Sequence, residues 1–285
     1  MKTYNDLYLQ TRNIFRTNGI EGFSLEAKLL VAKAAGKTVE QLMRDLNLFS
    51  SAAVEKAVTE FTERRLQGEP IAYIAGLWEF YGLPMIVSRD VLIPRMDTEV
   101  LIDATKKILT GNHMDARILD LCCGSGCISC ALAHELPASR VVAVDISTAA
   151  LGICRKNVAL NRLNSRIICM QADAGKQPPF GLGSFDLIVC NPPYITTSEI
   201  AELDPSVKDY EPLLALDGGE DGLSFYRSVI KYWKVVLKDD GVLLFEVGEG
   251  QAAPVCEMMC DAGFSVTQTF RDTIGVERAV AGFLR

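Results

Sequence analysis

The main constraint on the fold is an alternation of short apolar runs and helix-like segments that begins near residue 117. Five runs have the length and branched apolar content of buried strands: residues 117–121, 140–145, 166–171, 185–190 and 241–247. Helical spacing of apolar side chains marks the segments between them: residues 127–136, 148–161, 223–237 and 251–262. The alternation predicts an α/β domain with a parallel, doubly wound sheet, because strand–helix–strand units pack in that way.

The segments on either side of this alternation have different patterns. Residues 264–270 and 277–284 are apolar stretches with no helix between them, and they predict an antiparallel hairpin at the sheet edge. Residues 73–87 and 91–94 are short, β-rich and punctuated by glycine and proline, which suits a hairpin connector. We therefore expect one domain over residues 76–285 that contains the connector and the sheet.

Residues 1–75 predict helices only. Ser24 is a candidate cap for residues 25–35, and Thr38 with Gln41 has the pattern of a capping box. Ser51 opens a segment of helical spacing that ends at Gly68. The result is a small helical bundle, which is either a packing module or a clamp for a macromolecular substrate.

Composition excludes some classes of function. The 285 residues are 49% apolar, enough for a sizeable core, and the formal net charge is −7 without a long basic run. Generic attraction to nucleic-acid phosphates is therefore not expected. The first residues lack the apolar core of a secretory signal and no apolar run approaches a bilayer span, so we expect a cytoplasmic protein without membrane association.

Four of the nine cysteines crowd into residues 122–130, and Cys127 and Cys130 have CxxC spacing. Zinc or redox chemistry must therefore be weighed. However, Gly124 and Gly126 lie among these cysteines in what resembles a ligand-binding turn, and a tetrahedral metal there would displace the ligand. Buried cysteine also behaves as a small apolar residue. We expect no metal.

A cofactor turn is expected after the strand at 117–121, because ligands of such sheets bind at the carboxyl ends of strands. Two glycines let the backbone approach a ligand there. The candidate cofactor-binding residues of this turn are Cys122, Cys123, Gly124, Ser125 and Gly126. A dinucleotide site would have a third glycine or alanine at position 129, which is Ser129. The turn alone leaves NAD and S-adenosylmethionine open.

Three more candidates follow the next two strands. Asp145 ends its strand at a distance suited to a carboxylate that accepts both ribose hydroxyls; capping of the next helix is the alternative. Asp173 is placed to accept from an adenine amino group, with the N–H of Ala174 beside it; a solvated loop carboxylate is the alternative.

The segment Asn191, Pro192, Pro193 and Tyr194 follows the run at 185–190 and predicts the reacting site. Two prolines cannot donate to a sheet ladder, so their carbonyls are free and rigidly directed. The Asn191 side-chain oxygen and the Pro192 carbonyl can then accept both hydrogens of a substrate NH2 group. This raises electron density on a poorly nucleophilic nitrogen and orients its lone pair. Tyr194 would pack on the flat amide and exclude water.

The chain resembles the release-factor glutamine methyltransferases, the HemK/PrmC family, over nearly its whole length. Four stretches carry the resemblance beyond residues 191–194: residues 69–76 (Glu-Pro-Ile-Ala-Tyr-Ile-Ala-Gly), 79–83 (Glu-Phe-Tyr-Gly-Leu), 92–99 (Leu-Ile-Pro-Arg-Met-Asp-Thr-Glu) and the loop 211–223. The family usually has glycine and threonine where this chain has Cys122 and Cys123. We expect this departure to affect cofactor affinity more than activity.

The resemblance implies a Rossmann-like, seven-stranded class I methyltransferase sheet and an N-terminal domain that recognises the substrate. It implies transfer from S-adenosylmethionine to N5 of the glutamine in the Gly-Gly-Gln motif of class-one peptide chain release factors. It further implies that residues 122–126, Asp145, Ala174 and Asn191 contact the cofactor, and that residues 191–194 bind the glutamine.

Three alternatives stay open at this point. Glutamine of a ribosomal protein is the nearest, since sequence separates the two substrates poorly. An adenine-N6 nucleic-acid methyltransferase shares the Asn-Pro-Pro-Tyr segment, but would be expected to carry a basic groove. A cofactor-binding scaffold without catalysis would leave that segment unexplained.

Overall fold

A computed structural model describes residues 1–109 and 115–284, which divide into two compact units. Residues 1–77 with 204–210 form the first unit, and residues 78–203 with 211–285 form the second. The described residues include no helix long and apolar enough to cross a membrane. Each unit is considered by itself below.

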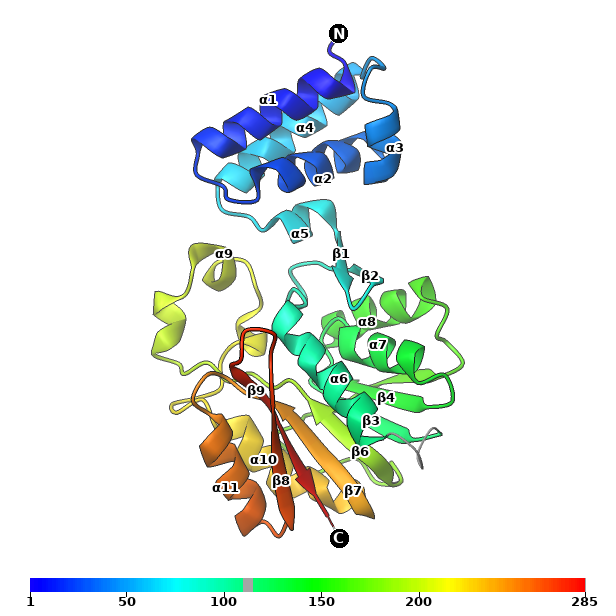
Figure 1. Cartoon of the computed structure of the whole chain (residues 1–285), viewed down its shortest axis with the longest axis vertical. Coiled ribbons are helices and arrows are strands. Elements are labelled where there is room, and N and C mark those ends of the chain that lie inside the picture. The colour runs from blue at the N-terminus through cyan, green and yellow to red at the C-terminus, as the bar shows by residue number, and fades with distance from the viewer. Residues whose placement is uncertain (110–114, 285) are drawn as a thin grey trace. The chain divides into compact units, whose positions relative to one another are not determined.

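The first unit consists of helices (Figure 1), and side-chain caps begin most of them. Its helices are α1 (Tyr4–Thr17), α2 (Phe23–Ala35), α3 (Val39–Arg44), α4 (Ala52–Leu66), α5 (Ile71–Ala75) and α9 (Pro205–Lys208). The predicted capping box of Thr38 and Gln41 and the Ser51 cap are both confirmed. A second capping box, formed by Thr3 and Asp6, starts α1 and was not predicted.

Two expectations for this unit are wrong. Ser24 does not cap α2, because the helix begins at Phe23 after Gly22, and the Ser24 hydroxyl instead bonds the Tyr8 hydroxyl at 3.0 Å. Residues 73–75 are helical rather than extended, since α5 continues to the left-handed Gly76. The connector is otherwise a hairpin of β1 (Leu77–Phe80) and β2 (Leu83–Ile86). Residues 91–94 form no strand.

The second unit contains a seven-stranded sheet in the order β5-β4-β3-β6-β7-β9-β8. Its strands are β3 (Arg117–Leu121), β4 (Arg140–Asp145), β5 (Ile167–Gln171), β6 (Phe185–Cys190), β7 (Leu237–Glu246), β8 (Val266–Arg271) and β9 (Glu277–Phe283). Strands β3 to β7 are parallel, whereas β9 runs antiparallel to both β7 and β8. The α/β sheet and its terminal antiparallel hairpin are as predicted.

Helices cover both faces of this sheet. The unit contains α6 (Glu99–Ile108), α7 (Cys127–Glu135), α8 (Thr148–Leu160), α10 (Ser224–Trp233) and α11 (Ala252–Asp261), with short 3-10 helices η1 (Met96–Thr98), η2 (Glu199–Glu202), η3 (Leu213–Ala215) and η4 (Lys234–Val236). The segment expected as one helix over residues 223–237 ends at Trp233 and continues as η4. Helix α6 was not predicted.

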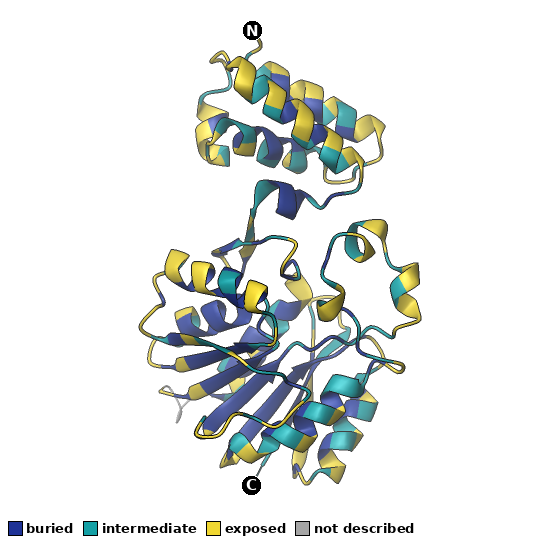
Figure 2. Ribbon diagram, turned by 180° about the vertical axis from the view of Figure 1, so that it is seen from behind, coloured by how far each residue is buried: buried dark blue, intermediate teal, exposed yellow. Residues whose placement is uncertain are grey.

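Alternating side chains of the strands form two cores, one on each face. Ile118 and Leu187 belong to the core under α6, α7 and α8, whereas Leu119 and Ile188 belong to the core under α10 and α11. All six residues of β6 are buried, and the central strands of the sheet appear dark blue in Figure 2. β3 and β6 are neighbours in the sheet, and α7 and α8, which follow β3 in the chain, pack on one face only. The carboxyl ends of β3 and β6 therefore form the topological switch point of the sheet.

Candidate active site

The two segments predicted to carry the chemistry leave adjacent strand ends. Leu121 at the end of β3 pairs in register with Cys190 at the end of β6. The turn after Leu121 and the segment after Cys190 therefore start side by side. They line one cavity together with Asp145, Asp173 and Ala174. Of the predicted residues, the cavity wall includes Cys122, Cys123, Gly124, Ser125, Asp145, Asp173, Ala174, Asn191 and Pro193.

Left-handed backbone shapes the turn after β3. Gly124 and Gly126 have φ of 51° and 76°, and Cys122 also has a positive φ of 59°. A Cβ at Gly126 would come within 2.5 Å of the Cys154 sulfur, so only glycine fits there. At Gly124 a Cβ would meet nothing within 4 Å. The turn is therefore open on its Gly124 side, where a ligand can approach the backbone.

Asp120, in β3 just before this turn, holds the turn by hydrogen bonds to the start of α7. Its Oδ2 accepts from the Ser129 N–H at 3.0 Å and from the Ser129 hydroxyl at 2.5 Å. The carboxyl is fully buried, and burial raises its pKa to about 7. Ser129 replaces the third glycine of a dinucleotide turn, and its bonds to Asp120 hold the start of α7 against β3. A role for this pair was not predicted from the sequence.

Asp145 holds the turn from the neighbouring strand. Its Oδ2 accepts from the Gly124 N–H at 2.8 Å and its Oδ1 from the Ser147 N–H at 2.9 Å. Burial raises the pKa of this carboxyl. Ser147, whose hydroxyl accepts from the Ala150 N–H, is the residue that caps α8. Asp145 is therefore not the helix cap, and its carboxylate lies at the cavity wall.

Asp173 and Ala174 are fixed by local bonds. Asp173 accepts from the Gly175 N–H at 2.8 Å and pairs with Lys176 at 3.2 Å. The carbonyl of Ala174 accepts from the indole N–H of Trp233 at 3.0 Å, so a buried side chain of α10 holds the backbone at this residue. Both residues line the cavity, and their contact with adenine stays a prediction.

The Asn191 side chain is oriented by Thr98. The Asn191 Nδ2 donates to the Thr98 Oγ1 at 3.3 Å, so Oδ1, on the other branch of the same planar amide, points away from Thr98. Both residues line the cavity. Pro192 and Pro193 are buried, and of the two only Pro193 lies on the cavity wall.

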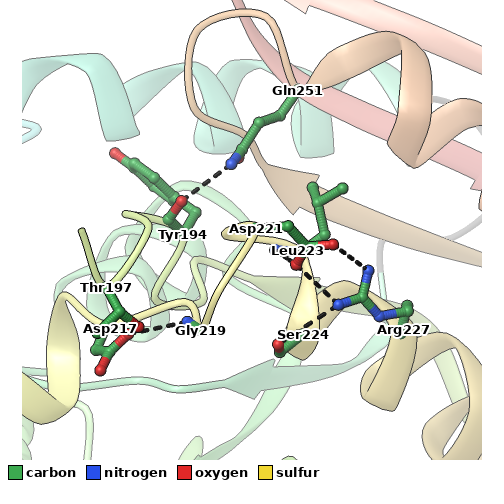
Figure 3. Close-up of polar contacts among 9 residues, drawn as sticks. All are labelled: Tyr194, Thr197, Asp217, Gly219, Asp221, Leu223, Ser224, Arg227 and Gln251. Atoms are coloured by element: carbon green, nitrogen blue, oxygen red, sulfur yellow. Dashed lines mark hydrogen bonds and ion pairs between the residues drawn. The ribbon is translucent and has the colours of Figure 1, made fainter. Parts of the chain in front are cut away.

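Tyr194 is half-buried behind the wall and is held at both ends. Its hydroxyl donates to Glu246 Oε1 at 3.3 Å. Its carbonyl accepts from Gln251 Nε2 at 2.9 Å, as Figure 3 shows. Burial and the nearby Glu246 raise the pKa of its phenol. Glu246 and Gln251 were missed in the sequence, although Glu246 ends a buried strand in the same way as Asp145.

The loop 211–223 is tied to the segment before α6. Glu211 is buried; its Oε2 accepts from the Ile93 N–H at 3.1 Å, and its Oε1 pairs with Arg95. Pro94 and Arg95 line one side of the cavity, while Pro212 and Leu214 line another. Glu211 therefore links the loop 211–223 to the segment at Arg95, which lies 116 residues away in the chain.

The CxxC cysteines lie in the core. Burial raises the pKa of Cys127 and of Cys130 to about 12, so both stay protonated near neutral pH. Residues 1–109 and 115–284 contain no group of three or more histidine, cysteine or acidic side chains that could hold a metal ion.

The chain is similar to known proteins over nearly its whole length. Two family models match the chain: the PrmC N-terminal domain over residues 6–76 and the Methyltransferase small domain over residues 94–203. A protein of Geobacter sulfurreducens named release factor glutamine methyltransferase is 38% identical over 272 residues, which cover 95% of this chain and 93% of that protein. The chain belongs to the release factor glutamine methyltransferase family. A family protein of the same name from Thermodesulfovibrio yellowstonii is 40% identical over 228 residues, covering 78% of this chain and 79% of its own.

Solved structures agree on the fold. The catalytic domain of hMettl16, crystallised with a 3'UTR hairpin, superposes with a TM-score of 0.57 at 19% identity, covering 82% of each chain. At this identity the likeness concerns the fold alone. It confirms the class I methyltransferase fold of this member of the release factor glutamine methyltransferase family.

Proposed function

We propose that this chain transfers the methyl group of S-adenosylmethionine to the N5 side-chain amide of the glutamine in the Gly-Gly-Gln motif of class-one peptide chain release factors. Family membership supports the reaction class, and relatives that align over most of their length carry this substrate in their names. The observation that carries the proposal is the Asn191 amide, whose NH2 group is engaged by Thr98 while its oxygen stays available at the cavity.

The cavity fits the methyl donor. The turn at residues 122–126 leaves space beside the Gly124 backbone, and the Asp145 carboxylate next to it suits two ribose hydroxyls. Asp173 and the Ala174 N–H would face the adenine amino group and ring. S-adenosylmethionine supplies an electrophilic methyl group on a sulfonium ion.

Asn191 and Pro192 would act on the other reactant. An amide nitrogen is a poor nucleophile because its lone pair is delocalised. The Asn191 Oδ1 and the Pro192 carbonyl would accept its two hydrogens, which increases electron density on nitrogen and turns the lone pair toward the methyl group. Pro193 and Tyr194 would enclose the flat amide and exclude water. No strong base is required, since the proton can leave to solvent after transfer.

Selection of one glutamine requires contacts away from the reacting nitrogen, because a single side chain offers little surface. The helices of residues 1–75 are the proposed recognition domain. Direct binding of nucleic acid is not part of this proposal, since the chain has a formal net charge of −7.

The proposal is tested with labelled S-adenosylmethionine and purified full-length release factors, followed by mass spectrometry of the modified residue. We expect label on the Gly-Gly-Gln glutamine, and none after its replacement by glutamate, which has no NH2, or by asparagine, which withdraws the amide by one methylene. Asn191→Ala should lower single-turnover transfer about a hundredfold while cofactor binding changes much less. Labelling of a ribosomal-protein glutamine or of adenine instead would reject the release-factor assignment.

A further inference from the structure

Arg95 is a residue of the cavity wall that the mechanism above does not use. Among the described residues that line the cavity, it is the only one with a cationic side chain, whereas Asp90, Asp145 and Asp173 are acidic. S-adenosylmethionine carries a carboxylate at its methionine end, away from the adenine and the ribose. A carboxylate that leaves water needs a charged or hydrogen-bonding partner, because burying it unpaired is costly. Arg95 is the side chain of this wall whose charge suits that carboxylate.

The strand order places Arg95 toward the methionine end of the cavity. The sheet runs β5-β4-β3-β6 across this region. Asp173, the proposed adenine contact, follows β5, and Asp145, the proposed ribose contact, ends β4. A ligand that continues in the same direction reaches the ends of β3 and β6, where Asn191 lies. Thr98 accepts from Asn191 at 3.3 Å, and the Thr98 N–H donates to the Arg95 carbonyl at 3.2 Å, so Arg95 is one turn of η1 away from the reacting segment.

A buried acid holds the Arg95 side chain in place. The Glu211 side chain is 1% exposed; its Oε1 pairs with Arg95 Nη2, and its Oε2 accepts from the Ile93 N–H at 3.1 Å. The Arg95 side chain remains 42% exposed. A guanidinium has five N–H donors in a planar fork, so a pair through Nη2 leaves donors for a second carboxylate. Because Glu211 orients the fork before a ligand arrives, less side-chain freedom is lost on binding.

We propose that Arg95 binds the carboxylate of the methionine part of S-adenosylmethionine and that Glu211 positions Arg95 for this contact. The inference rests on the proposed function, because it takes S-adenosylmethionine as the ligand. The other candidate for the carboxylate is the start of α7, since Cys127 and Ile128 also line the cavity and the first N–H groups of a helix attract anions.

Three ligands isolate this contact. Calorimetry gives the Kd of S-adenosylmethionine, of its decarboxylated form, which lacks only the carboxylate, and of 5′-methylthioadenosine, which keeps the adenine and ribose but lacks the amino-acid part. Arg95→Gln should raise the Kd of S-adenosylmethionine about tenfold, near the lower end for a charged hydrogen bond because the guanidinium is partly exposed. The Kd of 5′-methylthioadenosine should change less than about threefold, and the Kd of the decarboxylated form should not rise.

Two further variants separate the contact from packing. Arg95→Gln leaves Glu211 as a buried carboxylate without its cation, which costs stability. The double variant Arg95→Gln/Glu211→Gln removes both charges and should show the same pattern with the three ligands. Arg227→Gln is the matched control, because Arg227 pairs with Asp221 outside the cavity wall and is about half exposed (Figure 3). It should leave all three Kd values unchanged.

The inference requires that both Arg95 variants lose affinity only for the ligand that carries the carboxylate. An unchanged Kd for S-adenosylmethionine in the folded double variant would overturn it and assign the carboxylate to the start of α7. An equal loss for all three ligands would also overturn it, since the cavity as a whole would then be disturbed. If the parent binds S-adenosylmethionine but leaves release factors unmethylated, the proposed function fails and the Kd values still decide the role of Arg95. A parent that binds no S-adenosylmethionine would refute both.

Discussion

Gly222 offers a direct test of how the reacting segment is held in place. It lies in the loop after Tyr194 with a φ of 70°, and an added Cβ would come within 2.4 Å of the Tyr194 carbonyl oxygen and 2.7 Å of Gln251 Nε2. These two atoms form the hydrogen bond that holds the Tyr194 backbone (Figure 3). Gly218 approaches the same residue, since its Cβ would lie 2.7 Å from the Tyr194 Cα. Gly222→Ala therefore has to move the segment or break the bond.

The expected magnitude follows from two contributions. Left-handed backbone costs an alanine roughly 1–2 kcal/mol relative to glycine. Loss of the Gln251 hydrogen bond, with its carbonyl partner left unpaired, adds about 1–2 kcal/mol. The free energy of unfolding should thus fall by about 3 kcal/mol. A shift of about 1 Å at Tyr194 or at its neighbour Asn191 should also lower the transfer rate roughly a hundredfold.

Gly275→Ala is the matched control, because Gly275 has a φ of 89° but a Cβ there would meet nothing within 4 Å. It should cost only the backbone contribution of about 1–2 kcal/mol and should leave transfer unchanged. Urea denaturation gives the two free energies, and single-turnover transfer to a release factor gives the rates. Equal losses of stability and equal rates in the two variants would refute the steric argument for Gly222.

Three further predictions follow from the cavity wall and the buried acids. Asp145→Ala should weaken cofactor binding by roughly 1.5–3 kcal/mol with the fold retained, and an unchanged Kd by calorimetry would contradict the ribose contact. Cys122→Gly should raise the free energy of unfolding by up to about 1 kcal/mol, since glycine relieves a φ of 59°, without weakening the cofactor Kd. The Asp120 pKa of about 7 lies above its unfolded value of 3.8, so the folded state keeps a proton that the unfolded state releases, and the stability from this carboxyl is lost as pH rises from about 4 to about 7. Asp120→Asn should remove up to about 4 kcal/mol of that decline, measured as the difference in unfolding free energy between pH 4 and pH 8.

The sheet could be predicted because its strands are buried on both faces. Residues 117–121, 140–145 and 185–190 read as continuous apolar runs, and the structure places strands at those bounds. The rule that ligands bind at carboxyl strand ends pointed to Asp145 and Asn191, and both residues line the cavity. Helix caps could also be predicted where both partners lie a few residues apart in the chain, as in the Thr38–Gln41 capping box.

Other features depend on tertiary contacts that no local pattern contains. Ser24 has the chemistry of a cap, but its hydroxyl bonds Tyr8 and the helix starts earlier. In the sequence, Glu211 is one of several acidic residues in its loop. In the structure it is buried and pairs with Arg95 and the Ile93 N–H, which lie 116 and 118 residues away in the chain. Thr98 was recognised only as part of a family signature; its bond to Asn191 spans 93 residues. Pairings of this range are set by the topology of the sheet rather than by neighbouring residues.

The position of Glu246 bears on the kind of catalysis that the site can perform. A general base must reach the proton that it removes, directly or through one water. Glu246 is buried and does not line the cavity, so it lacks that reach, whereas Thr98 and Asn191, which do line it, have no base of suitable strength. Transfer to an amide does not need one, because a nitrogen that has gained a methyl group and a positive charge is strongly acidic and loses its proton to water. What the reaction needs before transfer is a correctly oriented acceptor. The Glu246 carboxylate accepts the Tyr194 hydroxyl from behind the wall, so it holds that side chain without offering a second nucleophile to the methyl donor.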